Sequence, residues 1–500
     1  MKSTEEQSLD YFSSSITEST KIETTDSFNE TQKNISMMSL NSTVHVSLED
    51  NDVENLNGTS VQAEQKRLLR KLDLRIMPLF CLFYFVDFLD RANIGNATLA
   101  GLQVDLSMSS TELSTAISAF FITYIIFEIP SNIILEKTNA ANWLSFIMFA
   151  WGIATVATAF VKDFSGLLIV RLFLGAAESG YIPGILFLLS KVYTPHEFSI
   201  RVSLLLTMAT LSGIVSGPLT YLVSLWDGVH GLHGWQYLFI TEGIPTILLS
   251  IVSYFFLFDD LQTVSWLTNE QKELQKKRTG DQAKPNSDHT ATITVVCVVL
   301  LDWKTWAFGL IFFLNSIAIT SFGVFSPMLI SGFGFEPSTA QLLTAPPCVT
   351  GTLGILLGGY LVSRYDARAP ILVIGSTMIA ISYLALYFIY HKWVLYSILL
   401  IIPLGIGIQA SAAFGWPALN YSELTTRAIA VATILMIGNV GSIVAAYLFK
   451  SSDAPRYGFA VLFNCVASVV SAFLSAWTGI KLYRLDKIPC SELNTFRYYY

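Results

Sequence analysis

Residues 76–99 read IMPLFCLFYFVDFLDRANIGNATL, an apolar stretch that contains the acid–base pair Asp90 and Arg91. A helix of about 20 apolar residues crosses a hydrocarbon core about 30 Å thick. An ionised side chain within such a helix is costly, so it usually faces the protein interior and marks a pathway for a solute or a proton. The stretch therefore predicts a transport site inside a membrane.

Eleven further apolar segments follow, and a polar stretch over residues 259–303 divides the twelve into two sets of six. Hydrophobic residues make up 52% of the chain and charged residues 13%, against about 25% charged in soluble proteins. The sequence predicts an all-α membrane protein with an N-terminal lobe over 65–258 and a C-terminal lobe over 304–482. The predicted spans are 76–99, 113–135, 142–161, 165–190, 202–225, 236–258, 304–330, 338–362, 369–390, 394–415, 427–449 and 458–482.

Basic residues are distributed unequally between the two sides that these spans define. Twenty-one lysines and arginines fall on the side of the two termini and the central loop, and four fall on the other. Because cytoplasmic segments are enriched in basic residues, we predict that both termini and the 259–303 loop are cytoplasmic. Residues 1–64 hold twelve acids and three lysines with few aromatics, which predicts a disordered acidic tail. Residues 483–500 form a second cytoplasmic tail.

Five long blocks of sequence carry a resemblance to a known family. The blocks are KLDLRIMPLFCLFYFVDFLDRANIGNA at 71–97, AFFITYIIFEIPSNIILEK at 119–137, RLFLGAAESGYIPG at 171–184, GWQYLFITEGIPTILL at 234–249 and WLTNEQKEL at 266–274. Through them the chain resembles, over about residues 66–485, the anion:cation symporter family of the major facilitator superfamily, and within it the fungal allantoate permease branch of vitamin and organic-anion permeases. The resemblance implies the twelve-helix major facilitator fold and proton-coupled import of a carboxylate nutrient such as nicotinate, pantothenate, biotin or allantoate.

Charged residues within the predicted spans give candidates for proton coupling. Asp87, Asp90 and Arg91 are spaced i, i+3 and i+4, so they share one face of the first span. Arg171 and Glu178 share a face of the fourth span, and Arg171 lies at about the depth of Asp90 at 1.5 Å of rise per residue. We therefore predict an Asp90–Arg171 ion pair that protonation releases, with Glu178 as a second proton carrier. Ion pairs that merely hold two helices together are the alternative.

Arg91 is the candidate for binding the anion itself. A guanidinium stays charged when buried and grips a carboxylate through two parallel hydrogen bonds. In the bacterial galactonate and vesicular glutamate transporters, which the chain resembles, the arginine at this place is associated with carboxylate binding. The galactonate transporter further implies Asp90 and Glu178 as proton-coupling acids and Tyr124 as a substrate contact. Phe88 replaces a tyrosine of that transporter, which argues against a sugar acid.

The second lobe offers neutral candidates for the rest of the substrate. Asn315, Gln409 and Asn439 lie in the seventh, tenth and eleventh predicted spans and can select a substrate by hydrogen bonds. Aromatic residues are available to flank a ring: Phe322, Phe325 and Trp416. Each amide can equally be a satisfied core residue.

Other classes of protein are disfavoured by what the sequence lacks. The sequence contains no phosphate-binding loop of an ATP-driven pump, no nucleophile triad and no metal-ligand set. We therefore predict that the protein is not an enzyme and that it has no cofactor, no metal and no nucleic-acid partner. We expect a monomer, with the plasma membrane as its location and an internal membrane such as the endoplasmic reticulum as the alternative. Gly213, Gly217 and Pro218 resemble part of a drug antiporter motif, which leaves proton-driven efflux open, although small residues also permit close helix packing. A non-transporting nutrient sensor that signals through residues 1–64 is a further alternative.

Overall fold

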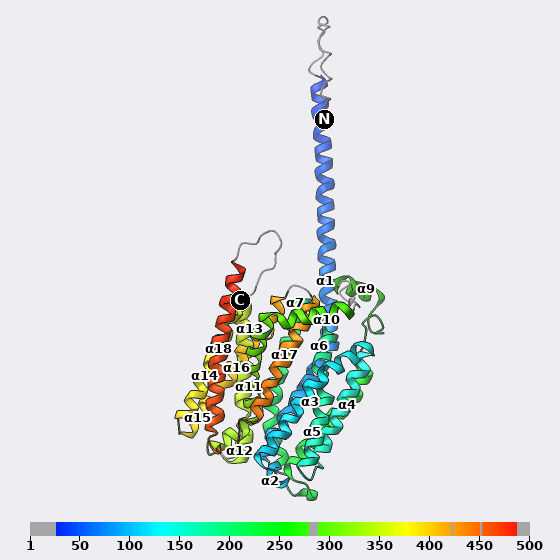
Figure 1. Cartoon of the computed structure of the whole chain (residues 1–500). Helices are drawn as coiled ribbons and strands as arrows, with labels where there is room; N and C mark the ends of the chain where they lie inside the picture. The colour runs from blue at the N-terminus through cyan, green and yellow to red at the C-terminus, as the bar shows by residue number, and fades with distance from the viewer. Residues whose placement is uncertain (1–26, 280–288, 422–423, 451–452, 488–500) are drawn as a thin grey trace, which may run out of the picture. The chain divides into compact units, whose positions relative to one another are not determined.

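The computed structural model describes residues 27–279, 289–421, 424–450 and 453–487 (Figure 1). The chain divides into two compact units, residues 1–71 and 72–500. Helix α1, Ser27–Leu99, contributes to both. Residues 1–26 of the predicted tail lie outside the described residues, whereas residues 27–64 carry helical backbone. The disorder of residues 1–64 stays a prediction, since an isolated polar helix is only marginally stable in water.

The first lobe is built from the C-terminal part of α1 and the helices that follow it. Local signals start several of these helices: Ser109 and Glu112 form a capping box before α3, and the Asp163 carboxylate accepts from the Gly166 N–H at 2.8 Å before α5. The helices are α2 Leu102–Asp105, α3 Ser110–Lys137, α4 Ala140–Thr158, α5 Phe164–Glu178, α6 Tyr181–Val192, α7 Pro195–Ser224, the short η1 Val229–Gly231 and α8 Gly234–Phe256.

The second lobe follows two helices of the central loop, α9 Asn269–Thr279 and α10 His289–Leu301. Within it α11 packs on α17, α13 on α16 and α14 on α18. The helices are α11 Trp303–Gly332, α12 Pro337–Leu342, α13 Ala345–Tyr365, α14 Arg368–Phe388, α15 Lys392–Leu399, α16 Ile401–Ala413, the short η2 Pro417–Asn420, α17 Leu424–Ala446 and α18 Gly458–Asp486. No β-strand occurs in the described parts of the chain, so the predicted all-α fold is confirmed.

Eleven helical segments among the described residues are long and apolar enough to cross a membrane. They correspond to the second to twelfth predicted spans. The first, residues 76–99, is the C-terminal part of α1 and differs from the others because Asp87, Asp90 and Arg91 lie within it.

The fourth predicted span, residues 165–190, corresponds to the membrane-crossing segment Phe164–Val192. Helix α5 ends at Glu178 and α6 begins at Tyr181, and Ser179 and Gly180 between them keep right-handed helical backbone. A Cβ atom on Gly180 would overlap the Ser131 hydroxyl of α3. The turn that follows Glu178 therefore lies close against α3.

The two lobes meet through α7 with α13 and through α3 with α17. Thr352 Oγ1 donates to Thr210 Oγ1 at 2.8 Å across the first contact. A Cβ atom on Gly213 would lie 2.6 Å from Cys348 Sγ. The small residues at 213–217 therefore let α7 approach α13 closely. This contact supports helix packing, and not an antiporter motif, as the explanation for these residues.

Close helix packing predicts unequal effects for two adjacent glycines of α13. A Cβ atom on Gly358 would lie 2.8 Å from Ile408 Cα on α16, whereas one on Gly359 meets nothing within 4 Å. We expect Gly358→Ala to destabilise the fold by about 1–3 kcal/mol, as overpacking does. Gly359→Ala should leave stability unchanged or raise it, because alanine favours helix. Thermal unfolding of the purified variants, followed by size-exclusion chromatography, checks this; equal midpoints would contradict it.

Candidate functional site

Four polar side chains of α1 are buried inside the first lobe. Asp87, Asp90, Asn93 and Asn96 follow one another at intervals of three residues, so they wind around the helix toward different neighbours. Asn96 Nδ2 donates to the Ser216 hydroxyl of α7 at 2.6 Å, which fixes this part of α1 against a neighbouring helix. Buried polar groups in a membrane helix mark functional positions. This row of polar residues therefore forms the framework of the candidate site.

Arg91 is the centre of an ion-pair network that joins α1 to α5. Its Nε lies 3.3 Å from Asp87 Oδ2 and donates to Glu178 Oε1. This contact was not predicted from the sequence, because Arg91 and Glu178 lie 87 positions apart and meet only through tertiary packing. The Arg91 side chain keeps 23% of its surface exposed, whereas Glu178 is fully buried. Arg91 Nη2 has no hydrogen-bond partner among the described residues. The guanidinium therefore retains donor capacity.

Three aromatic rings surround this guanidinium. Its central carbon lies 5.0 Å from the ring centre of Tyr124, 5.2 Å from that of Phe88 and 5.9 Å from that of Phe120. Such contacts orient a guanidinium by cation–π attraction. Tyr124 therefore lies beside Arg91, and its role as a substrate contact stays a prediction. Phe120 was not singled out from the sequence.

Asp90 does not form the ion pair predicted for it. No ion pair within 4.0 Å joins it to Arg171 among the described residues; instead Asp90 accepts from Trp151 Nε1 at 2.6 Å and from Asn93 Nδ2 at 3.5 Å. Arg171 is 3% exposed, and its Nε and Nη2 have no hydrogen-bond partner in the described part of the chain. Equal depth in the membrane does not give two side chains the same direction around their helices. Arg171 interacts with Glu178 and Asp90 only through longer-range electrostatics.

A further buried acid, Glu242, lies on α8 in the same lobe. It is 2% exposed, and neither carboxylate oxygen has a hydrogen-bond partner in the described residues. The sequence carried the signal, a single acid within the apolar block GWQYLFITEGIPTILL. The rule applied to Asp90, that an acid inside a span is functional until shown otherwise, would have found it.

In the second lobe, the three predicted amides meet at one cavity. Asn315, Gln409 and Asn439 line a space of about 90 Å³ between α11, α16 and α17, together with Phe312 and Phe414. Asn315 Oδ1 accepts from Ser471 Oγ at 2.7 Å, and Gln409 Oε1 accepts from Ser376 Oγ at 3.0 Å. Their amide nitrogens are buried without partners among the described residues. The cavity therefore presents hydrogen-bond donors.

The aromatic residues predicted to flank a ring do not line this cavity. Phe325 stacks on Phe449 with ring centres 4.3 Å apart, and Trp416 packs against Phe308 at 5.0 Å. Phe322 is likewise part of the hydrophobic core. All three are needed for packing between helices.

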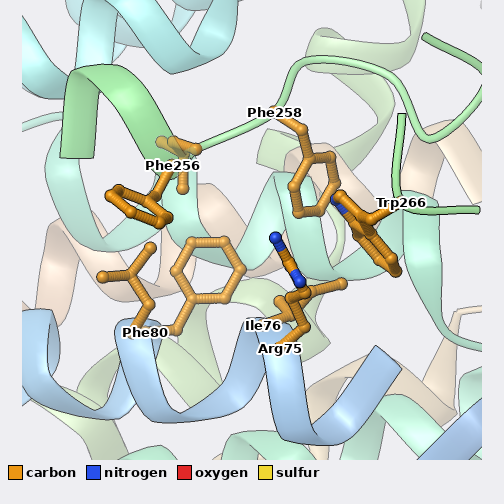
Figure 2. A pocket seen from close by; sticks show the side chains of 8 residues that line it. Arg75, Ile76, Phe80, Phe256, Phe258 and Trp266 are labelled. Atoms are coloured by element: carbon orange, nitrogen blue, oxygen red, sulfur yellow. The ribbon is translucent and has the colours of Figure 1, made fainter. Parts of the chain in front are cut away.

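A second hollow lies between residues 75–80 of α1, the C-terminal end of α8 and the segment that carries Trp266, and it can be followed in Figure 2. Arg75, Phe80, Phe256 and Trp266 are among its lining residues, and the Arg75 guanidinium lies 5.4 Å from the Trp266 ring centre. Its volume is about 10 Å³, which is no larger than a single water needs. An organic anion does not fit there.

Comparison with known proteins gives concordant results. A family model described as Major Facilitator Superfamily matches residues 80–446. The curated "MFS transporter prlL" of Fungal sp. (strain NRRL 50135) is 30% identical over 406 residues, 79% of this chain and 82% of that protein. A "Putative tartrate transporter" of Agrobacterium vitis is 32% identical over 385 residues, 76% of this chain and 84% of that protein.

Solved structures show the same fold. A bacterial homologue of the human lysosomal transporter Spinster, in an inward-facing and occupied conformation, matches 83% of this chain and 98% of its own with a TM-score of 0.65. The sequence identity is 16%, so this likeness concerns the arrangement of the helices alone.

Proposed function

The chain belongs to the Major Facilitator Superfamily, whose members are multi-pass membrane transporters and not enzymes, and from this premise we propose that it imports a small organic anion together with protons. The observation that carries the proposal is the Arg91 guanidinium, partly exposed, oriented by aromatic rings and held by two buried acids. A cation in that position attracts a carboxylate, and the acids beside it can bind the protons.

Glu178 and the substrate carboxylate compete for the same donor in this mechanism. While Glu178 is ionised, Arg91 Nε is occupied by it. Protonation of Glu178 removes that charge and frees the guanidinium for the substrate. Proton binding and anion binding then favour one another, as thermodynamic linkage requires. An acidic exterior loads the site and a neutral cytoplasm unloads it.

Asp90 and Arg171 act in the same cycle as proton-coupling residues. Asp90 is held by Trp151 of α4, and Arg171 of α5 lies within electrostatic range of Asp90 and Glu178. A proton on Asp90 weakens its attraction to Arg171 and changes how α1 sits against α4 and α5. This gives the lobe a way to bias the alternating-access equilibrium.

The cavity of the second lobe is proposed to hold the neutral end of the substrate. Free amide nitrogens of Asn315 and Gln409 suit an acceptor such as a ring nitrogen, a carbonyl or a ureido oxygen. A carboxylate on one end and a neutral acceptor on the other fit nicotinate, pantothenate, biotin and allantoate alike. The relative named as a tartrate transporter supports a carboxylate substrate. Within the superfamily we assign the chain to the allantoate permease branch of the anion:cation symporters.

The orientation and location are part of the proposal. The excess of basic residues on one side supports a cytoplasmic location for both termini. We propose a monomer in the plasma membrane, where an importer meets external nutrients.

Uptake of labelled carboxylates by cells that lack their own carriers tests the function. Saturable accumulation of one compound at acidic external pH, abolished by an uncoupler, is the expected result. Resistance to toxins without accumulation would favour efflux instead. Binding without flux, with a response lost when residues 1–64 are deleted, would favour a sensor.

Replacing a cavity amide should change selectivity. We expect Gln409→Leu to weaken binding of carboxylates that carry a neutral acceptor by about tenfold, the value of one hydrogen bond of about 1–1.5 kcal/mol. Affinity for a short unsubstituted monocarboxylate should be unchanged. Asn464→Leu, a buried amide of α18 outside the cavity, is the matched control. Equal losses for both kinds of ligand would contradict a selective role for Gln409.

A further inference from the structure

Glu242 is a buried acid that the mechanism above leaves unused. We propose that Glu242 carries one of the co-transported protons and acts with Asp90 as a pair of carboxyl groups. The inference rests on the proposed proton coupling but concerns a different residue from those that contact the anion.

No cation pairs with Glu242. Neither of its oxygens has a well-formed hydrogen bond in the described residues, and the Asn93 amide is the side chain that interacts with it. No lysine or arginine of the described chain lies within 4.0 Å of it, since no ion pair includes it. An ionised carboxylate buried without a cation is very costly. A proton is the smallest ligand that satisfies this group.

Two buried charged groups approach this part of α8. Arg171 of α5 lies with its guanidinium carbon 5.9 Å from the Phe239 ring centre, and its electrostatic partners are Glu178 and Asp90, so Asp90 is the group that couples to Glu242. Asp90 faces it from α1, and the two interact electrostatically. Helix α4, which packs on α8, contains no titratable residue. On α7, which also packs on α8, Glu197 pairs with Arg278 at 2.8 Å and Arg201 pairs with Asp73 at 2.6 Å, so these charges are already matched.

Two neighbouring acids titrate as a pair, because the charge on one disfavours the charge on the other. Asn93 lies between them and donates to Asp90 at 3.5 Å. When Asp90 takes up a proton from the exterior, Glu242 can release its own toward the cytoplasmic side without placing two negative charges together. The pair thus moves a proton through the lobe while Arg91 and Glu178 handle the anion.

Proton-to-anion stoichiometry in proteoliposomes tests the inference. Loss of one transported proton in Glu242→Gln should lower the accumulation ratio about tenfold for each pH unit of imposed gradient. Glu242→Asp, which keeps a carboxyl group, should keep the wild-type stoichiometry. Ser250→Ala, a buried polar residue two turns along the same helix face, is the control. Wild-type stoichiometry in Glu242→Gln would overturn the proposal, and so would uptake that stops when sodium is replaced by choline.

A measurement without substrate separates this inference from the proposed function. Infrared difference spectra of the purified wild type and Glu242→Asp in nanodiscs, recorded across a pH series, report protonated carboxyl groups directly. A carboxyl band that titrates in the wild type and moves in Glu242→Asp supports proton binding at this residue, even if no organic anion is transported. A band that does not respond to pH or to the substitution would overturn it.

Discussion

Glu178→Gln is expected to lower proton-driven accumulation of the anion by the contribution of one proton while leaving exchange across the membrane intact. Glutamine cannot take up a proton, and it carries no negative charge that competes with the anion for Arg91. A gradient of two pH units stores about 2.7 kcal/mol per proton, enough for about hundredfold accumulation by one proton. The proton carried by the Asp90–Glu242 pair remains, so at this gradient the variant should accumulate the anion about a hundredfold less than the wild type.

The same variant should lose the pH dependence of binding. In the wild type, affinity rises as the pH falls, because protonation of Glu178 releases the Arg91 donor. In Glu178→Gln, affinity at neutral pH should equal that of the wild type at acidic pH. Counterflow of labelled substrate and equilibrium binding at two pH values measure both effects, with Glu273→Gln on the exposed face of α9 as a control. Concentrative uptake at the wild-type level would exclude Glu178 as a coupling acid.

Much of the fold was predictable because membrane-spanning helices have a distinctive amino-acid composition. Long apolar runs and the bias of basic residues predict the spans, and eleven of the twelve meet the criterion of length and apolarity in the described chain. The close contact between Gly180 and Ser131 was not predicted, because it depends on tertiary packing and joins residues 49 positions apart in the sequence.

The sequence predicted which residues belong to the site better than it predicted which of them interact. Asn315, Gln409 and Asn439 were selected only as polar residues in three apolar spans, and they line one cavity. Arg171 was paired with the wrong acid because helix rise gives depth and not direction. Glu178 reaches Arg91 because α5 packs closely on α3, where Gly175 lies against the Phe120 carbonyl. That approach depends on tertiary packing, which the spacing of residues along one helix does not predict.

Arg91→Lys is expected to weaken anion binding by about tenfold or more, although the charge is kept. Hydrogen bonds to charged groups contribute about 1.5–3 kcal/mol each, and lysine cannot reproduce the two parallel bonds of a guanidinium. Lysine still balances Asp87 and Glu178, so the fold should survive, whereas Arg91→Ala would leave two buried carboxylates without their cation. The conservative variant is therefore the informative one.

The pH dependence of Arg91→Lys separates substrate binding from proton coupling. Glu178 still competes with the anion for the remaining positive charge, so affinity should rise with acidity as it does in the wild type, from a weaker starting value. Arg75→Lys, at the small hollow beside Trp266, makes the same substitution away from the site and should leave affinity unchanged. If Arg91→Lys kept full affinity for every carboxylate transported, the guanidinium would be a structural cation for Asp87 and Glu178, and the anion would have to be held elsewhere. If affinity fell and its pH dependence disappeared with it, Arg91 would belong to the proton pathway as well as to the anion site.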